Sequence, residues 1–306
     1  MSRLVISPGK TIVYSFFLGG LLALVAQMLL ALWQATLMGT PLEFFAGGAT
    51  LVSLGVIGCV LGGTGIYQVL QKWATFGALL PFSGFAMAVG MKAIHDWTRE
   101  EASSRKCVWD CVWFVLWFNV LFAVISILLG AICGLAGIGE PSWTTQKVTD
   151  SAVFYHAFVV GGVMSALFQG VFLVAKKRFE KCTALHILMI VWMCGAVFIP
   201  CGLSGFLYNW GGEGFAAMAT VGGYNMFNVG VDFVTGQTST ALLHLGSFSL
   251  TVAGLGVCSI FTWFLYSCLY GRTTLSDVHY RRTCRMAKNI KVDAALILKA
   301  VDEQGE

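Results

Sequence analysis

Eight stretches of this chain contain no aspartate, glutamate, lysine or arginine, and this pattern limits its possible folds more than any other feature. The stretches are 11–42, 44–71, 73–91, 111–139, 151–175, 182–212, 214–231 and 233–271. A helix needs about 20 apolar residues to cross the hydrocarbon core of a bilayer. Charged residues make up only 11% of the chain, whereas soluble domains carry about 25%. The sequence therefore predicts an all-α polytopic membrane protein.

Two of the stretches, 73–91 and 214–231, are marginal in length for a span and rich in glycine. The first is interrupted in quick succession by Gly77, Pro81 and Gly84. Non-helical backbone at membrane depth is tolerated only where protein or a water-filled cavity satisfies it. We therefore expect two re-entrant broken helices and about six transmembrane helices.

The second half of the sequence repeats the first. Gly19-Gly20 followed by Gln27 returns as Gly161-Gly162 followed by Gln169, an offset of 142 residues. Internal repetition of this kind changes the expected fold. It predicts one repeat over 1–145, containing the broken element 73–91, and a second over 146–272, containing 214–231.

Two looser correspondences follow the same order. Gly62-x-x-Gly65 is matched by Gly202-x-x-Gly205. Ser83-Gly84-Phe85 is matched by Gly222-Gly223-Tyr224.

The distribution of lysine and arginine predicts the topology, because positive charges favour cytoplasmic loops. With six spans and two re-entrant elements, both termini are cytoplasmic, and every lysine and arginine except Lys147 lies inside. With eight spans, loops 92–110 and 176–181 and their basic residues would lie outside. Three spans per repeat is an odd number, so the two repeats would be inverted, as in many transporters.

Polar groups within the apolar stretches are the candidate functional residues. Gln27 and Gln169 occupy the same position in each repeat, and two roles stay open: hydrogen bonds that join helices, or pore lining. The neighbouring glycines, Gly19, Gly20, Gly161 and Gly162, indicate close helix packing in either case.

The broken elements supply the other candidates. A helix that begins inside the membrane presents unpaired N–H groups that favour an anion, and the alternative is a plug that binds nothing. The returning helix of the first element is expected to open at Phe85-Ala86. The candidates are Gly77, Pro81, Ser83, Gly84, Phe85, Gly214, Gly222, Gly223, Tyr224, Asn225 and Asn228.

Several functional classes are not indicated. No nucleophile and base, metal-ligand cluster or phosphate loop stands out, so neither enzyme activity nor a cofactor or metal is expected. Most of the ten cysteines lie in apolar stretches, where cysteine packs as a small hydrophobe. Asp232 is expected at the membrane interface, and His244 is expected to be packed and neutral. The net charge of +4 is dispersed and forms no nucleic-acid-binding stripe.

The C-terminal segment 273–306 has apolar residues near helical spacing. It predicts a cytoplasmic amphipathic tail that either docks on lipid or a soluble partner, or is simply solvated.

The first half resembles the stage V sporulation protein AC and AE membrane families of spore-forming bacteria, over about residues 12–135. Their pattern is Gly-Gly-x6-Gln in the first helix, then Gly-x-Tyr, then Gly-Ala-x-x-Pro-x-Ser/Thr-Gly-Phe. The matching residues are Gly19, Gly20, Gln27, Gly65, Tyr67, Gly77, Ala78, Pro81, Ser83, Gly84 and Phe85. The second half keeps Gly161, Gly162 and Gln169, has Val221 near the position of the proline, and has the longer spacing Gly205-x-x-Tyr208. The chain thus resembles two such subunits fused head to tail.

This resemblance implies a channel or channel subunit that passes dipicolinic acid, or its calcium chelate, across the spore inner membrane during sporulation or germination. It also implies other sporulation membrane proteins and a soluble cytoplasmic subunit as partners. The alternatives are a secondary transporter of another small solute and a non-conducting membrane scaffold. The shortage of carboxylates inside the spans argues against proton coupling.

Overall fold

The computed structural model describes residues 7–100, 102–138, 150–216, 221–279 and 281, and within these ranges the regular structure is entirely helical. The helices, in chain order, are α1 (Pro8–Leu37), η1 (Glu43–Phe45), α2 (Ala46–Gly63), α3 (Tyr67–Trp73), α4 (Thr75–Leu79), α5 (Phe82–Arg99), α6 (Ser104–Leu135), α7 (Ala152–Arg178), α8 (Ala184–Val197), α9 (Leu203–Gly211), α10 (Glu213–Ala216), α11 (Val221–Val234) and α12 (Thr238–Tyr270). Most of the tail 273–306, including the expected amphipathic helix, lies outside the described residues.

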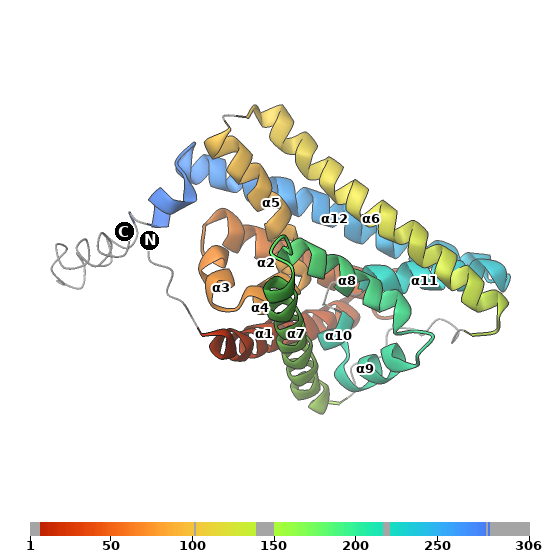
Figure 1. Ribbon diagram of the computed structural model, residues 1–306. Helices are drawn as coiled ribbons and strands as arrows, with labels where there is room; N and C mark the ends of the chain where they lie inside the picture. The colour runs from red at the N-terminus through yellow and green to blue at the C-terminus, as the bar shows by residue number, and fades with distance from the viewer. Residues whose placement is uncertain (1–6, 101, 139–149, 217–220, 280, 282–306) are drawn as a thin grey trace.

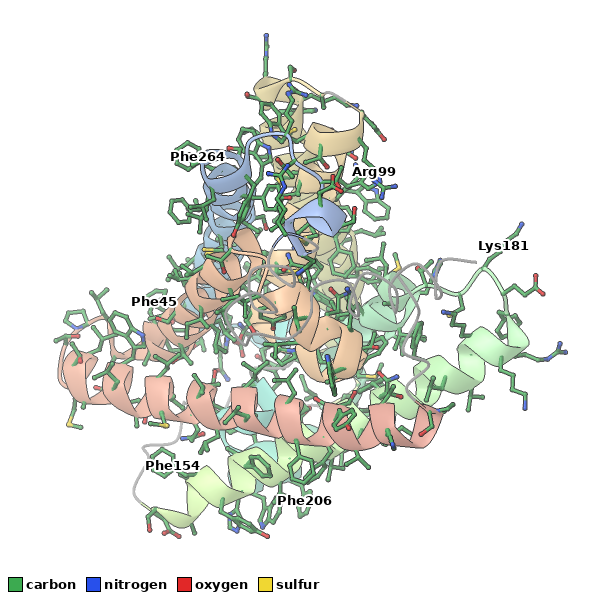
Figure 2. The ribbon with its side chains drawn as sticks, turned by 90° about the vertical axis from the view of Figure 1, so that its left-hand side faces the viewer. Phe45, Arg99, Phe154, Lys181, Phe206 and Phe264 are labelled. Atoms are coloured by element: carbon green, nitrogen blue, oxygen red, sulfur yellow. The ribbon has the colours of Figure 1, made fainter. Side chains whose placement is uncertain are left out.

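Five segments in the described residues are long and apolar enough to cross a membrane. They are Pro8–Leu37, Glu43–Gly63, Ser104–Leu135, Ala152–Arg178 and Thr238–Tyr270. Their outer surfaces are apolar: Leu128, Ile132, Val174 and Phe264 are all more than half exposed. Figure 2 shows such side chains projecting from the outside of the molecule. The polytopic all-α membrane fold is therefore confirmed.

The sixth expected span is divided in the structure. The stretch 182–212 forms α8, of 14 residues, and α9, of nine. At 1.5 Å per residue, α8 is about 21 Å long, shorter than the hydrocarbon core of about 30 Å. Pro200 follows α8, and Gly202 has a left-handed φ of 70°. Both residues interrupt a helix, so an uncharged stretch of sufficient length does not form one continuous span here.

The first broken element comprises two helices separated at Leu80–Pro81. Pro81 has an extended backbone, with ψ at 149°, and α5 begins at the next residue, Phe82. Proline lacks a backbone N–H but fits a helix start. The returning helix therefore opens three residues before the expected Phe85 and continues to Arg99, beyond the expected limit at residue 91.

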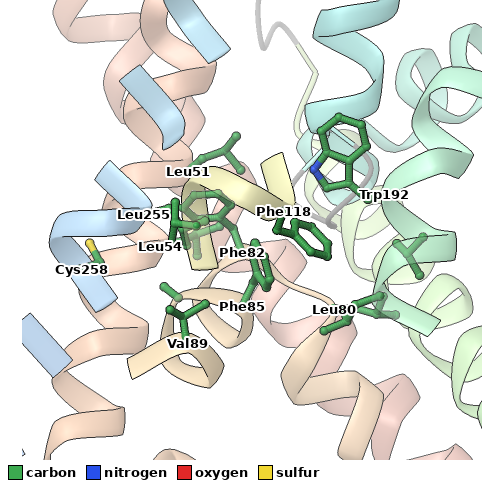
Figure 3. Packing of buried hydrophobic residues seen from close by; sticks show 14 of the residues in the cluster. Leu51, Leu54, Leu80, Phe82, Phe85, Val89, Phe118, Trp192, Leu255 and Cys258 are labelled. Carbon is green, nitrogen blue, oxygen red and sulfur yellow. The ribbon is translucent and has the colours of Figure 1, made fainter. Parts of the chain in front are cut away.

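The helices form two groups with the broken elements between them (Figure 1). On one side α1 crosses α7, and on the other α6 lies beside α12, an arrangement that Figure 2 shows from a second direction. The helix α5 packs on α2 and α12, and α11 packs on α6 and α8. A buried core joins these helices. Figure 3 shows Phe82, Phe85 and Phe118 grouped between Leu255 and Trp192.

Candidate functional site

The two predicted glutamines hold the starts of the two broken elements. Gln27 of α1 accepts a hydrogen bond through its Oε1 from the backbone N–H of Glu213, at 2.7 Å. Gln169 of α7 accepts one in the same way from the N–H of Phe76, at 3.0 Å. Both glutamines are 1% exposed. Each glutamine thus fixes the broken element of the other half of the chain.

The four packing glycines lie where α1 crosses α7. A Cβ on Gly19 would overlap Ser165, and it would come within 3.2 Å of the carbonyl oxygen of Gly161. A Cβ on Gly20 would press on Phe158, and one on Gly162 would press on Phe16. Small residues let helix backbones approach closely in membranes, and this crossing requires them.

Gly77 and Gly214 allow the broken elements to lie against the same two helices. A Cβ on Gly77 would meet the backbone of Ser15 in α1, and one on Gly214 would meet the backbone of Ala157 in α7. Side chains at these positions would force α4 and α10 away from the helix crossing.

The break at Pro81 is held by a small buried hydrogen-bond chain. Tyr67 donates its hydroxyl hydrogen to the carbonyl oxygen of Ala78 at 2.7 Å, and its oxygen lies 2.9 Å from Ser83 Oγ. A Cβ on Gly84 would overlap the carbonyl oxygen of Ala78. The predicted residues Ser83 and Gly84 therefore join the two sides of the break.

A first cavity, the helix-end cavity, lies where the starts of α5 and α11 approach each other. Its volume is about 20 Å³, room for about one water molecule. Its lining residues are Phe82, Phe85, Asn119, Trp192, Gly222, Asn225, Phe248, Thr251, Val252 and Leu255. Asn119 Nδ2 donates to the carbonyl oxygen of Val115 in its own helix at 2.9 Å. The cavity therefore combines the first turns of two helices with an apolar wall.

A second cavity, the glutamate cavity, shares Asn225 with the first. Its volume is about 60 Å³, room for roughly two to four waters. Its lining residues are Phe44, Gly47, Gly48, Leu51, Tyr208, Glu213, Ala216, Tyr224, Asn225, His244 and Ser247. Because Asn225 lines both cavities, its half-buried side chain lies on their common wall.

Two acidic residues at or near the glutamate cavity are buried in the protein. Glu213 and Asp232, which bound two of the charge-free stretches, are 2% and 1% exposed. His244 lies between the cavity and Asp232, with its Nε2 3.9 Å from Asp232 Oδ2. Asp232 is buried because its helix, α11, packs on both α6 and α12, and its expected place at the membrane interface stays a prediction.

The structure divides the predicted site residues into two groups. Phe85, Gly222, Tyr224 and Asn225 line the cavities. The others hold the framework around the cavities: Gln27, Gln169, Gly77, Pro81, Ser83, Gly84, Gly214 and Gly223, the last of which lies against the backbone of Trp192. Asn228 is 1% exposed, and its Nδ2 has no hydrogen-bond partner in the described structure.

Sequence reasoning missed Asn119, Glu213 and Ser247 as cavity residues. Asn119 carried a usable signal, since it is an amide within the charge-free stretch 111–139, as Gln27 is within its own. Glu213 did not, because a carboxylate between two apolar stretches is normally part of a loop at the membrane surface.

The long apolar helices and the lipid-compatible surface define a polytopic α-helical protein embedded in a membrane. Residues 11–132 match the model of the SpoVAC/SpoVAEB sporulation membrane protein family. The family resemblance drawn from the motif residues of the first half is thereby confirmed for that part of the chain, and the second half lies outside the match. Searches of curated proteins and of solved structures gave no match.

Proposed function

We propose that this protein is a membrane channel, or a subunit of one, that passes dipicolinic acid or its calcium chelate across the spore inner membrane during sporulation or germination. The family match of residues 11–132 supports the sporulation role. The helix-end cavity is the observation that best supports a conduit. It is lined by the first turns of both α5 and α11, which come from the two halves of the chain.

The chemistry of this cavity suits an anionic group. The first N–H groups of a helix have no partner within the helix, and they carry partial positive charge. Phe82 and Phe85 belong to the first turn of α5, and Gly222 and Asn225 to the start of α11. Two helix starts beside one cavity would favour a carboxylate more than either start alone.

The inverted-repeat arrangement is part of this proposal, and reciprocal contacts support it. The bond from Gln27 to Glu213 has its counterpart in the bond from Gln169 to Phe76. The packing of α5 on α12 corresponds to that of α11 on α6. Gly65 and Gly202, each after the helix that follows the first span of its half, have left-handed φ values of 77° and 70°, although the sequence match pairs Gly202 with Gly62.

The cavities as they stand are closed to a dicarboxylate. Volumes of about 20 and 60 Å³ hold only a few waters. Passage requires the ring cluster of Phe82, Phe85 and Trp192 to separate from α12. We therefore interpret the structure as a closed state of the proposed conduit.

The proposed topology places both termini in the cytoplasm, where a soluble subunit could reach the tail 273–306. It rests on the distribution of basic residues described above. The proposal includes other sporulation membrane proteins as partners and involves no catalytic step.

Efflux of trapped dipicolinate from liposomes that contain the purified protein tests this proposal, with and without osmotic stretch. We expect non-saturating release that falls about tenfold in Asn225→Leu, the equivalent of one lost polar contact in the passage. Asn209→Leu in α9 is the matched control, because Asn209 is exposed and lines neither cavity. Release that saturates and needs an ion gradient would instead identify a secondary transporter.

Absence of release from liposomes that also contain the partner membrane proteins would identify a scaffold. In that case Asn225→Leu would alter assembly without altering permeability.

A further inference from the structure

A groove of about 890 Å³ lies beside the first turns of α6, far larger than either internal cavity. On α6, Arg105, Val108, Trp109 and Val112 line it, together with Ser103, Ser104 and Lys106, and Trp263 of α12 faces them. The spacing of Arg105, Val108, Trp109 and Val112 places them on one face of the helix. The groove is therefore basic at the start of α6 and apolar further along.

The two basic side chains at the start of the groove have weak ion pairs or none within the described residues. Lys106 Nζ lies 3.5 Å from Glu100 Oε2, and both side chains are about half exposed. Exposed pairs of this kind hold each other weakly. Arg105 forms no ion pair with any residue in the described ranges. The α6 N-terminus, capped by Ser103, adds partial positive charge at the same place.

The length of α6 indicates where the basic end of the groove lies relative to the membrane. Its 32 residues span about 48 Å at 1.5 Å per residue, whereas the hydrocarbon core is about 30 Å thick. The first turns therefore extend to the level of the lipid headgroups. Val108, Val112 and Trp263 then continue toward the acyl-chain region.

A buried indole at the floor of the groove gives an independent sign of a missing ligand. Trp263 is 6% exposed, and its Nε1–H has no hydrogen-bond partner in the described structure. Buried tryptophan N–H groups usually have an acceptor. A glycerol ester carbonyl seated in the groove would provide one.

We propose that this groove between α6 and α12 is a binding site for one anionic phospholipid, with its phosphate at Arg105, Lys106 and the α6 N-terminus and an acyl chain along Val108, Val112 and Trp263. The groove is cationic at one end and apolar further along. This order matches an anionic phospholipid, which has a charged headgroup followed by apolar acyl chains. Aromatic belts and basic residues are the usual anchors at this level. The site is separate from the cavities of the proposed conduit and does not depend on it.

Native mass spectrometry of the full-length protein, delipidated and titrated with phosphatidylglycerol or phosphatidylcholine, tests this site. We expect one phosphatidylglycerol to bind about tenfold more tightly than phosphatidylcholine, and Arg105→Gln/Lys106→Gln to remove this preference. Trp263→Phe, which keeps the ring but not the N–H, should weaken binding several-fold for both lipids. Lys176→Gln/Lys177→Gln is the matched control, since these adjacent exposed lysines lie in the last turn of α7 and line none of the three sites.

Three results would overturn the proposal. They are equal binding of the two lipids by the wild-type protein, an equal loss in the lysine control, and displacement of phosphatidylglycerol by inorganic phosphate at the same concentration. The last would assign the basic end to free phosphate. Because the readout is lipid binding, failure here leaves the flux test unaffected.

Discussion

The side-chain oxygen of Gln169 lies 3.0 Å from the backbone nitrogen of Phe76, 93 residues earlier in the chain. Gln169 also lies within hydrogen-bond distance of Ser15 and Thr11, so α7, α1 and the start of α4 meet at one amide. This amide provides, inside an apolar environment, the acceptor that a helix start otherwise lacks. The same function falls to Gln27 at the start of α10.

Replacing either glutamine by leucine should destabilise the protein by about 1–3 kcal/mol, because a buried N–H loses its partner. Thermal unfolding in detergent should show a lower Tm for Gln27→Leu and for Gln169→Leu. Gln71→Leu is the control, since Gln71 is only partly buried and makes no such bond to a broken element. Unchanged Tm values for both glutamine variants would show that these bonds are not structural.

Gly84→Ala should destabilise the protein at the first broken element, whereas Gly256→Ala in α12 should stabilise it. At position 84 a Cβ would overlap the Ala78 carbonyl oxygen, a backbone atom across the break. Overpacking typically costs about 1–3 kcal/mol. In Gly256→Ala nothing lies within 4 Å of the new Cβ, and alanine in a helix interior is favoured by about 0.5–1 kcal/mol. Opposite shifts in Tm are expected, and equal shifts would contradict this packing.

Much of this architecture follows from composition and spacing. The five long helices follow from apolar length, and the broken elements from Pro81 and the glycines around it. The role of Gln27 in bracing Glu213 could not be predicted, because it depends on which helix of one half crosses which element of the other. Periodicity specifies the faces of a helix but not its partner.

The division of the stretch 182–212 into two helices shows a second limit of prediction from the sequence. Length and apolarity alone predicted a span, and the Pro200–Gly202 turn decided otherwise. Asn119 and Glu213 became cavity residues only through the packing of α6, α10 and α11. The burial of Glu213 in particular depends on its contacts in three dimensions, which the linear sequence does not show.

Asp96, near the end of α5, should make stability depend on pH. Burial raises its pKa, but hydrogen bonds from Lys92 and His95 outweigh burial and hold the pKa below its usual 3.8. Since the folded pKa is depressed, the carboxylate stabilises the fold above the unfolded pKa, and this contribution is lost as the pH falls through the folded value. Tm measured from about pH 6 down to about pH 3 should fall more steeply in the wild type than in Asp96→Asn. Parallel curves would contradict the assignment.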